Sequence, residues 1–339
     1  MSNSRSGYHF AIIGCGKIAT RHAENITRIG KLISVCDIEN DKAIQLATNY
    51  NCAAFFSIDE LLTSEKEIDI VVICTPNGLH AAHSIKALQA NKIVLCEKPL
   101  CLSKKEGIQL QQAEANSSGK LFVVKSTRYN PAIIQLKEIL DKKQLGKIYS
   151  FQLNCFWNRP DSYYESNWKG TLHLDGGVLF TQFSHYIDVL LWLFGDVEKI
   201  NGFRKNLVHN KSIEFEDCGI VSVQMKNGIL GGINWSINSF LKNMEVSLTV
   251  LAEKGTLKIG GEFMNEIKYQ LLDGFAMKNL EKGNPNDYGT YKGSMSNHDK
   301  VYENLIRTLQ DQTIPFATIE DGLKTVDFIE TIYNSIPIS

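Results

Sequence analysis

The first third of the chain alternates short apolar runs with segments of helical spacing. Each run is too short and too continuously apolar for an amphipathic helix, so each predicts a buried strand. The five runs lie at 9–14, 32–37, 69–74, 92–97 and 121–125. The intervening segments 83–91 and 103–119 have helical spacing, and the second begins at Ser103 and stops at Gly119, which suit a helix N-cap and a helix end. This alternation predicts a doubly wound parallel sheet with helices on both faces.

The pattern changes after about residue 126. Helices are predicted at 131–143, where Pro131 suits the first turn, and at 180–195. The last forty residues predict two amphipathic helices. Longer segments with more alternation, which predict hairpins of an antiparallel sheet, lie at 147–158, 217–239 and 244–261.

These patterns predict an α/β protein of two domains, as the length of 339 residues also favours. Residues 1–126 carry the parallel sheet, and residues 127–339 form an α+β domain with a large, mostly antiparallel sheet. The stretch 273–297 is rich in Gly, Asn, Ser and Lys and predicts a long mobile loop.

Composition acts mainly by exclusion. The chain has 36 Lys and Arg against 37 Asp and Glu, so no basic surplus exists to hold nucleic acid or an anionic membrane. No apolar run approaches the roughly 18 residues of a membrane span. The N-terminus lacks the apolar core of a signal peptide, so we expect a cytoplasmic protein. The eight cysteines lack metal-site or disulfide spacing, which predicts reduced thiols and no metal site.

A glycine-rich turn, GCGKIA, follows the first predicted strand. Gly14 permits a tight turn, Gly16 lets the backbone approach a pyrophosphate, and Lys17 and Ile18 open a helix whose N–H groups face the phosphates. Asp37 ends the second strand, where a carboxylate accepts hydrogen bonds from the adenosine ribose and repels a 2′-phosphate. The pattern therefore predicts NAD rather than NADP, the alternative being a glycine turn in a domain that binds no nucleotide.

Two further motifs follow predicted strands. TPNGLH contains Thr75, Asn77 and His80, and CEKPL contains Glu97 and Lys98. In a doubly wound sheet the loops leaving the strand C-termini surround the ligand, so we expect these residues at the cofactor. For His80, a helix-capping or core role is an equal alternative.

Together, GCGKIA, TPNGLH, CEKPL and a later H-x-x-D helix at 185–188 resemble the Gfo/Idh/MocA oxidoreductases over almost the whole chain. The resemblance implies a Rossmann domain that binds NAD and a second domain for substrate binding and oligomerisation. It also implies hydride transfer between NAD(P) and a sugar, cyclitol or related alcohol.

Four segments are similar to a subgroup, the bacterial UDP-N-acetyl-2-amino-2-deoxyglucuronate 3-dehydrogenases. They lie at 123–131, 156–165, 168–177 and 180–188. The resemblance implies oxidation of the 3-hydroxyl of UDP-N-acetylglucosaminuronate to a 3-keto sugar, on the way to diacetamido-uronic acids of surface polysaccharide such as the O-antigen of lipopolysaccharide. It also implies that 2-oxoglutarate can act as the electron acceptor. Where many members of the wider family carry an Asp four residues before the helix His, this chain has Thr181.

Oxidation of a secondary alcohol removes a hydride and a proton. The cofactor takes the hydride, so the protein must supply the base and the geometry. Histidine titrates near neutral pH, which suits His185 to the proton transfer. Lys98 serves as a base if burial lowers its pKa, or stabilises the alkoxide if it stays charged. We predict Lys98 and His185 as the catalytic pair and leave open which takes the proton; a buried core histidine is the alternative for His185.

A substrate with a diphosphate and a carboxylate needs local cations. The predicted substrate contacts are Lys98, Lys125, Arg128, Asn130, Arg159, Tyr164, Thr181, Gln182 and His185. Lys169 is a further candidate cation, and the resemblance places Trp168 and Lys169 beside the cofactor. Trp157 and Trp168 can equally be core or subunit-interface residues.

Apolar residues on both faces of the predicted hairpins suggest sheet packing between subunits, giving a dimer or tetramer. Two other functions remain open at this point. One is a dehydrogenase of a free sugar or inositol, and the other is a non-catalytic dinucleotide-binding sensor of the same fold.

Overall fold

The computed structural model describes residues 7–280, 284–287, 292–311 and 316–338. The chain divides into two compact units. The first unit comprises Met1–Val124 and His298–Val326, and the second comprises Lys125–Asn297 and Asp327–Ser339. The first crossing lies within two residues of the predicted boundary at 126. The return of 298–326 to the first unit differs from the predicted linear division, because helix packing brings this late segment onto the early sheet.

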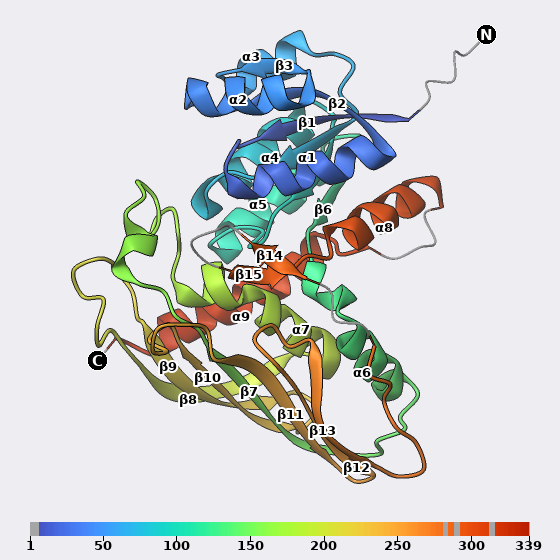
Figure 1. Cartoon of the computed structure of the whole chain (residues 1–339), viewed down its shortest axis with the longest axis vertical. Helices are drawn as coiled ribbons and strands as arrows, with labels where there is room; N and C mark the ends of the chain where they lie inside the picture. Colours follow the sequence, from blue (N-terminus) through green and yellow to red (C-terminus); the bar gives the residue numbers. More distant parts are fainter. Residues whose placement is uncertain (1–6, 281–283, 288–291, 312–315, 339) are drawn as a thin grey trace. The chain divides into compact units, whose positions relative to one another are not determined.

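The first unit contains a six-stranded parallel sheet of order β3-β2-β1-β4-β5-β6 (Figure 1). Its strands are β1 (Tyr8–Ile13), β2 (Gly30–Cys36), β3 (Ala53–Phe55), β4 (Ile70–Ile73), β5 (Ile93–Cys96) and β6 (Leu121–Val123). All five predicted strands are present, and β3 is an addition. Since β1 pairs with both β2 and β4, the strand order reverses between them, which is where such sheets bind ligands.

Helices connect these strands. They are α1 (Lys17–Ile29), α2 (Asn40–Tyr50), α3 (Ile58–Ser64), η1 (Asn77–Leu79), α4 (His80–Gln89), α5 (Lys104–Ala115) and the returning α8 (His298–Gln310). The final helix α9 (Ile319–Ser335) begins in the first unit and ends in the second. Ser103 caps α5 as predicted, in a reciprocal capping box with Glu106, but the helix ends at Ala115, before Gly119.

The second unit is built on a seven-stranded sheet of order β13-β12-β11-β7-β10-β9-β8. The strands are β7 (Ile148–Phe156), β8 (Val197–Lys205), β9 (Cys218–Met225), β10 (Leu230–Ser236), β11 (Glu245–Ala252), β12 (Gly255–Gly260) and β13 (Glu266–Leu272). Neighbouring strands are antiparallel except β7 and β10, which pair in parallel. The predicted fold class is therefore confirmed.

The remaining elements of the second unit lie before, between and after these strands. They are η2 (Ser126–Tyr129), α6 (Pro131–Asp141), η3 (Asp161–Tyr164), the π-helical turn η4 (Leu179–Phe183), α7 (Ser184–Phe194), β14 (Pro285–Asp287) and β15 (Lys292–Met295). The prediction of a long mobile loop over 273–297 was wrong in part, because β14 and β15 pair within this stretch. Residues 281–283 and 288–291 lie outside the described residues.

One face of the seven-stranded sheet is covered by α7. Nearly every residue of this helix is buried, as its apolar sequence predicts for a core helix. The ring of Phe194 stacks on Phe151 of β7 with centroids 5.1 Å apart. This packing fixes the helix that carries His185. None of the helices in the described part of the chain is long and apolar enough to cross a membrane.

Candidate active site

The glycine-rich turn joins β1 to α1 in the first unit. Gly14 has φ +92°, and a Cβ there would lie 2.6 Å from the carbonyl carbon of Cys74, so only glycine fits. A Cβ on Gly16 would meet no atom within 4 Å, so open space lies in front of this residue. Gly16 is the N-cap of α1 and supplies no side-chain cap, which leaves first-turn N–H groups for a phosphate. Lys17 and Ile18 begin the helix, and the turn fits a dinucleotide pyrophosphate.

Asp37 follows β2 and braces this turn. Its Oδ2 accepts the backbone N–H of Cys15 at 2.7 Å, and its Oδ1 accepts that of Glu39 at 2.9 Å. Each carboxylate oxygen keeps a second lone pair that can accept a ribose hydroxyl. The carboxylate therefore fits the adenosine ribose of NAD and disfavours a 2′-phosphate.

His80 joins the loops that follow β4 and β5. It is 1% exposed, and its ring nitrogens lie 2.8 Å from the carbonyl oxygen of Thr75 and 2.6 Å from that of Pro99. Burial lowers the pKa of His80, and these two carbonyls oppose that shift. With both nitrogens directed at backbone, the geometry favours the structural role left open for His80. Asn77, also buried, opens η1 in the same loop.

Lys98 stands at the end of β5 in the same unit. It is partly buried, and the preceding Glu97 is 6% exposed. The backbone N–H of Lys98 donates to Oε2 of Glu97 at 3.0 Å. Gly14, Asp37, Thr75 and Lys98 thus all follow the carboxyl ends of strands of one parallel sheet, as predicted.

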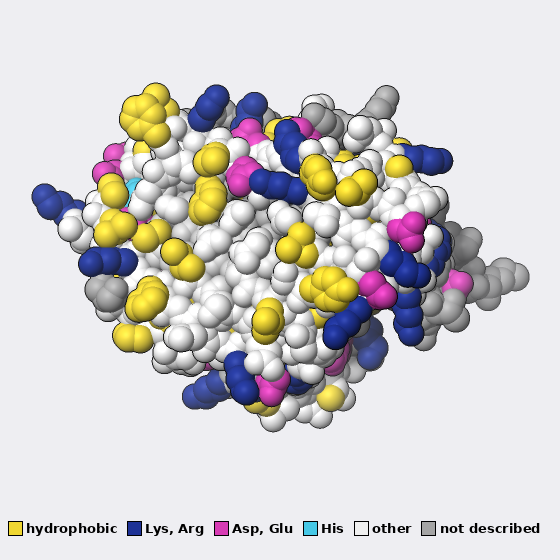
Figure 2. Space-filling view, turned by 90° about the horizontal axis from the view of Figure 1, so that it is seen from below, with side chains coloured by type: hydrophobic (Ala, Val, Ile, Leu, Met, Phe, Trp, Pro, Cys, Tyr) yellow, Lys and Arg dark blue, Asp and Glu magenta, His cyan; other side chains and the backbone are white. Residues whose placement is uncertain are grey.

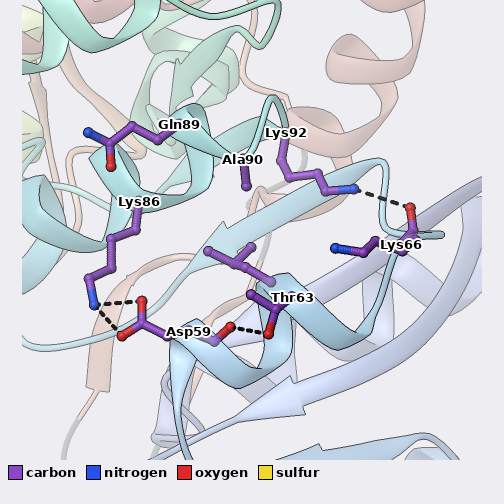
Figure 3. Close-up of a pocket in the computed structure, with 8 residues that line it drawn as sticks. Asp59, Thr63, Lys66, Lys86, Gln89, Ala90 and Lys92 are labelled. Atoms are coloured by element: carbon purple, nitrogen blue, oxygen red, sulfur yellow. Dashed lines mark hydrogen bonds and ion pairs between the residues drawn. The ribbon is translucent and has the colours of Figure 1, made fainter.

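A separate surface depression in the first unit lies at the opposite sheet edge (Figure 3). Lys92 there precedes β5, and its ammonium donates to the carbonyl of Ile68, which precedes β4. The ammonium of Lys86 is paired with both carboxylate oxygens of Asp59. Because parallel sheets bind nucleotides at the carboxyl ends of their strands, this depression is not the cofactor site.

In the second unit, His185 lies in the first turn of α7 and is 8% exposed. Its Nε2 lies 3.3 Å from the hydroxyl oxygen of Ser294 on β15. Sequence reasoning missed this partner, because Ser294 falls in the stretch predicted as a loop.

Asp188, one turn along α7, gathers two of the predicted substrate cations. The ammonium of Lys125 lies 2.9 Å from it, and the guanidinium of Arg128 donates twice to it at 2.8 Å. Burial alone would raise the pKa of Asp188, but Lys125 and Arg128 lower it. Two predicted substrate cations thus share one buried carboxylate of α7.

Arg159 is held among aromatic and amide groups. It is 2% exposed, its Nε–H donates to Gln182 at 2.9 Å, and its guanidinium lies 4.7 Å from the ring centroid of Trp157. Gln182 in turn donates to the hydroxyl of Tyr163 at 2.9 Å. The structure therefore brings together Arg159 and Gln182, which were predicted independently as substrate contacts.

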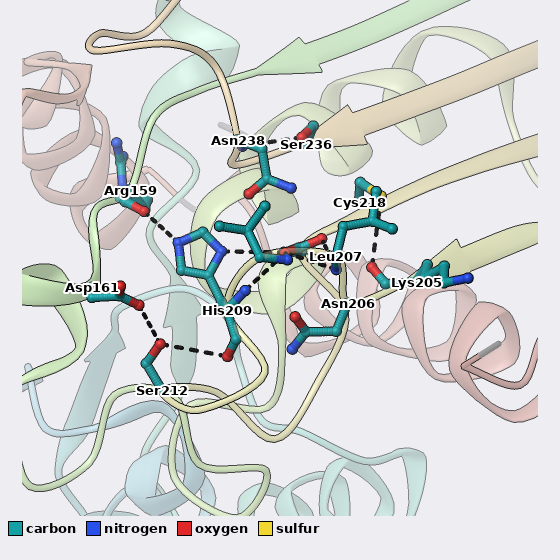
Figure 4. Close-up of polar contacts among 12 residues, drawn as sticks. Arg159, Asp161, Lys205, Asn206, Leu207, His209, Ser212, Cys218, Ser236 and Asn238 are labelled. Carbon is teal, nitrogen blue, oxygen red and sulfur yellow. Dashed lines mark hydrogen bonds and ion pairs between the residues drawn. The ribbon is translucent and has the colours of Figure 1, made fainter.

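A loop between β8 and β9 fixes the backbone at Arg159 (Figure 4). The Nε2 of His209 lies 2.8 Å from the carbonyl oxygen of Arg159, and its Nδ1 lies 3.3 Å from Asp217. The hydrogen bond with Asp217 raises the pKa of His209, and burial opposes it less strongly. A protonated His209 therefore donates to both partners.

The segment 163–169 supplies further predicted residues. The ammonium of Lys169 lies 3.5 Å from the ring centroid of Tyr163 and 5.9 Å from that of Trp168. Tyr164 is buried, and burial raises its pKa, so its hydroxyl stays protonated at neutral pH.

Two predicted polar contacts are engaged within the second unit. The hydroxyl of Thr181 donates to the carboxylate of Asp175, so a buried acid adjoins the position where many family members carry one. The amide of Asn130 donates to the carbonyls of Phe263 and Met264 and accepts from Asn297, which is a structural role. Asp175 was not predicted as a site residue because it lies nine residues before α7 begins.

Lys98 belongs to the first unit and His185 to the second, so their pairing at a substrate remains a prediction. The first unit nevertheless presents a dinucleotide cradle and a lysine at one sheet edge. The second presents a histidine with several cations. The cradle fits a hydride-accepting dinucleotide, and the histidine with its cations fits an alcohol substrate that carries anionic groups. These features are typical of the class of NAD-dependent oxidoreductases.

Comparison with known proteins agrees. The profile of the "Oxidoreductase family, NAD-binding Rossmann fold" matches residues 8–125, and that of the "GFO/IDH/MocA C-terminal domain" matches residues 133–258. The chain belongs to the Gfo/Idh/MocA family and is an NAD-dependent oxidoreductase acting on sugar-type alcohols.

Three relatives extend over nearly the whole chain. The WlbA dehydrogenase of Bordetella pertussis, solved with NADH and UDP-GlcNAcA, is 29% identical over 97% of this chain and 96% of its own, with TM-score 0.87. The WlbA dehydrogenase of Chromobacterium violaceum, solved with the same two ligands, is 32% identical over 98% and 94%, with TM-score 0.86. A glucose-6-phosphate 3-dehydrogenase of Bacillus subtilis is 24% identical over 97% of both chains.

Proposed function

We propose that the protein oxidises the 3-hydroxyl of UDP-N-acetylglucosaminuronate to the 3-keto sugar, in the synthesis of a diacetamido-uronic acid for surface polysaccharide. The observation that carries this proposal is the similarity to two dehydrogenases solved with that nucleotide sugar, which spans at least 94% of each chain.

The chain's own residues divide the work. Bound NAD supplies the hydride acceptor, and Gly14, Gly16 and Asp37 hold it. His185 and Lys98 act on the 3-hydroxyl, one taking its proton and the other stabilising the charge on oxygen. The cations Lys125, Arg128, Arg159 and Lys169 bind the diphosphate and the carboxylate.

Reduction of NAD tests the proposal directly. The purified protein is mixed with NAD and UDP-N-acetylglucosaminuronate, and the absorbance of the reduced nicotinamide is followed. Because the product NADH can stay bound, a parallel reaction contains 2-oxoglutarate and is assayed for 2-hydroxyglutarate and the keto sugar. Reduction of NAD with glucose 6-phosphate, and none with the nucleotide sugar, would replace the proposal with a second candidate function, oxidation of a sugar phosphate. Reduction with inositol alone would indicate an inositol dehydrogenase instead.

That second candidate, oxidation of a sugar phosphate, is favoured by the Bacillus subtilis glucose-6-phosphate 3-dehydrogenase. The same cations would bind its phosphate. A protein that binds NAD but oxidises no alcohol would instead be a non-catalytic dinucleotide-binding sensor.

Lys98→Met tests the lysine. We expect kcat to fall by roughly 10²-fold or more, since a charge-stabilising or proton-transferring group contributes about that much. Binding of NADH, followed by its fluorescence, should persist. Lys31→Met, which changes an exposed lysine of β2, is the matched control. An unchanged rate in Lys98→Met would contradict the assignment.

We also propose that a second copy of this chain covers the outer face of the seven-stranded sheet. Exposed apolar side chains on this face include Phe203, Ile220, Leu230, Leu251, Tyr269 and Leu271. Figure 2 shows hydrophobic side chains spread over the middle of the view from below, with most charged side chains nearer its rim. A face with few charges at its centre can pack against its own copy about a two-fold axis without opposing like charges.

A further inference from the structure

A buried carboxylate flanked by two imidazoles adjoins Lys98 in the first unit. Glu97 follows β5, His22 lies on α1, and His298 is the first residue of α8. The side chains of His22, His298 and Glu97 are 0%, 4% and 8% exposed. The two histidine Nε2 atoms lie 2.9 and 3.2 Å from the same atom, Oε1 of Glu97. Three ionisable groups are therefore gathered in the interior, where charge is costly without partners.

The hydrogen bonds assign the protons. Burial raises the pKa of Tyr302, so its hydroxyl keeps its proton. This hydroxyl lies 2.8 Å from Nδ1 of His22 and donates to it. His22, whose pKa burial lowers, is then neutral with its proton on Nε2, which donates to Glu97.

Glu97 is ionised despite its burial. Burial alone would raise its pKa, but the hydrogen bonds from His22 and His298 lower it well below the usual range. Its second oxygen accepts the backbone N–H of Lys98 at 3.0 Å. A carboxylate that accepts three N–H donors carries its charge at neutral pH. The backbone of Lys98 is thus bonded to a fixed negative charge.

The charges of Glu97 and Lys98 act on a common neighbour. Burial lowers the pKa of His80 most strongly, while the charge of Glu97 raises it and the charge of Lys98 lowers it by smaller amounts. Both charged groups therefore act on the same imidazole ring. The thiols of Cys74 and Cys96 also face Glu97, and burial raises the pKa of each thiol, so they are neutral. A fixed carboxylate favours the charged form of a neighbouring ammonium, and the effect is strongest where water is excluded.

We propose that Glu97, held by His22 and His298, is a positioning residue that fixes the backbone of Lys98 and keeps its ammonium protonated. This inference rests on the proposed function and assigns the roles left open there. Lys98 keeps its proton, donates to the 3-hydroxyl oxygen and stabilises the alkoxide. His185 accepts the hydroxyl proton.

Glu97→Gln tests the proposal by removing the charge at constant size. The first readout needs no turnover: acetic anhydride labels Lys98 in proportion to its neutral fraction, and mass spectrometry measures the label across a pH series. We expect the labelling midpoint to move down by about one pH unit or more. The alkaline limb of kcat/KM should move with it, while the acid limb, set by His185, stays in place. An unmoved midpoint in a folded variant would overturn the proposal.

Glu114→Gln is the matched control. Glu114 also accepts a backbone N–H in the first unit, that of Leu121 at 2.7 Å, but it lies on α5 and not beside Lys98 in the chain. We expect both limbs and the labelling midpoint to stay where they are. If Glu114→Gln moved the labelling midpoint as far as Glu97→Gln does, the shift would come from a general loosening of the first unit. That result would overturn the specific role of Glu97.

Lys98→Arg keeps the test decisive even if Glu97→Gln does not fold. Arginine is a permanent cation, so if Lys98 acts by its charge, Lys98→Arg should turn over at least about tenfold faster than Lys98→Met and its pH profile should lose the alkaline limb. If Lys98 acts as a base, both variants should be equally inactive. Zinc analysis of the purified protein covers the remaining outcome. The ligand atoms of His22, Glu97 and His298 lie within 4.8 Å of one another, and stoichiometric zinc lost in Glu97→Gln would make the cluster a metal site and overturn the proposal.

The two proposals fail in different ways. Turnover of the nucleotide sugar with an unmoved Lys98 midpoint in Glu97→Gln refutes the role of Glu97 alone. A moved midpoint in a protein that does not oxidise this sugar refutes the proposed substrate and leaves the influence of Glu97 on Lys98 standing.

Discussion

Asp188 neutralises part of the charge of Lys125 and Arg128, two predicted substrate contacts of the second unit. It is almost fully buried, and Lys125 and Arg128 both bind it within 2.9 Å. Removing its charge would leave two cations in the interior without their shared partner, which is costlier than losing an exposed ion pair.

Asp188→Asn should therefore lower the free energy of unfolding by about 3–5 kcal/mol. Urea denaturation at neutral pH measures this loss. The control is Asp196→Asn, whose carboxylate pairs with Lys226 on the surface at 3.2 Å and should cost no more than about 1 kcal/mol. Equal losses in the two variants would contradict the argument.

Asp37 is expected to set the cofactor preference. Asp37→Ser should weaken NADH binding about tenfold, because hydrogen bonds to a charged group are lost, and should weaken NADPH binding less. Fluorescence titration with both nucleotides measures the two dissociation constants. Glu39→Ser, two residues further on and exposed, should leave their ratio unchanged.

Residues whose role depends on a local motif could be predicted from the sequence, whereas residues whose partners lie far away in the chain could not. Gly14 and Asp37 were predicted because their chemistry depends on a local strand end. His298 hydrogen-bonds to Glu97 across 201 residues of chain, and Ser294 contacts His185 across 109. No local pattern in the chain carries information about such distant partners.

At the scale of elements, α5 shows how local chemistry sets a helix start. Ser103 accepts the backbone N–H of Glu106, whose carboxylate accepts that of Ser103. The strands of the first unit were predicted equally well, because each is a continuous apolar run. β3 was missed because its three residues are only partly buried, and β14 and β15 because their sequences resemble a loop.

Ser103→Ala should lower the free energy of unfolding by about 1 kcal/mol, the usual cost of losing an N-cap. Thermal or urea unfolding measures it. Ser117 lies just beyond the same helix, and its hydroxyl donates to the carbonyl of Glu114. Ser117→Ala should therefore lower the free energy of unfolding clearly less than Ser103→Ala. The reverse order would show that the cap contributes little to this fold.

The β8–β9 loop should make stability depend on pH. Its His209 has a raised pKa in the folded protein, chiefly through Asp217, so its contribution is complete below the unfolded pKa of about 6.5 and is lost as pH rises through the folded value. His209→Asn should therefore lose less unfolding free energy than the wild type between about pH 6 and about pH 9. Urea denaturation at both pH values measures the difference, and His173→Asn, at an exposed site, should behave as the wild type does. Identical pH dependence in all three proteins would refute this role.

At the scale of the whole molecule, the outer face of the seven-stranded sheet is the surface that we propose to form the subunit interface. Ile220 on β9 is 61% exposed and pairs with the exposed Phe203 on β8, whereas the next residue, Val221, is buried on the inner face. The strand pair therefore carries apolar side chains on both faces, and those of the outer face are exposed. Such a face is typical of a subunit interface.

Ile220→Glu should convert an assembly into monomers, because it places a charge in the predicted interface. Sedimentation velocity measures the mass. Ile108→Glu changes an isoleucine of comparable exposure, 45%, on α5 in the first unit, and it should leave the assembly intact. A wild-type protein that is monomeric throughout the concentration range would refute the interface.

The return of His298–Val326 to the first unit has a consequence for synthesis. A ribosome that has released only the first 124 residues has made every strand of the parallel sheet, yet neither His298 nor Tyr302. Glu97 and His22 then lack their partners on α8, and Gly107 lacks Leu323, which packs directly against it. The nucleotide-binding unit can therefore mature only after the chain has emerged to about residue 326, and an excised fragment ending at residue 124 should behave as an incomplete folding intermediate.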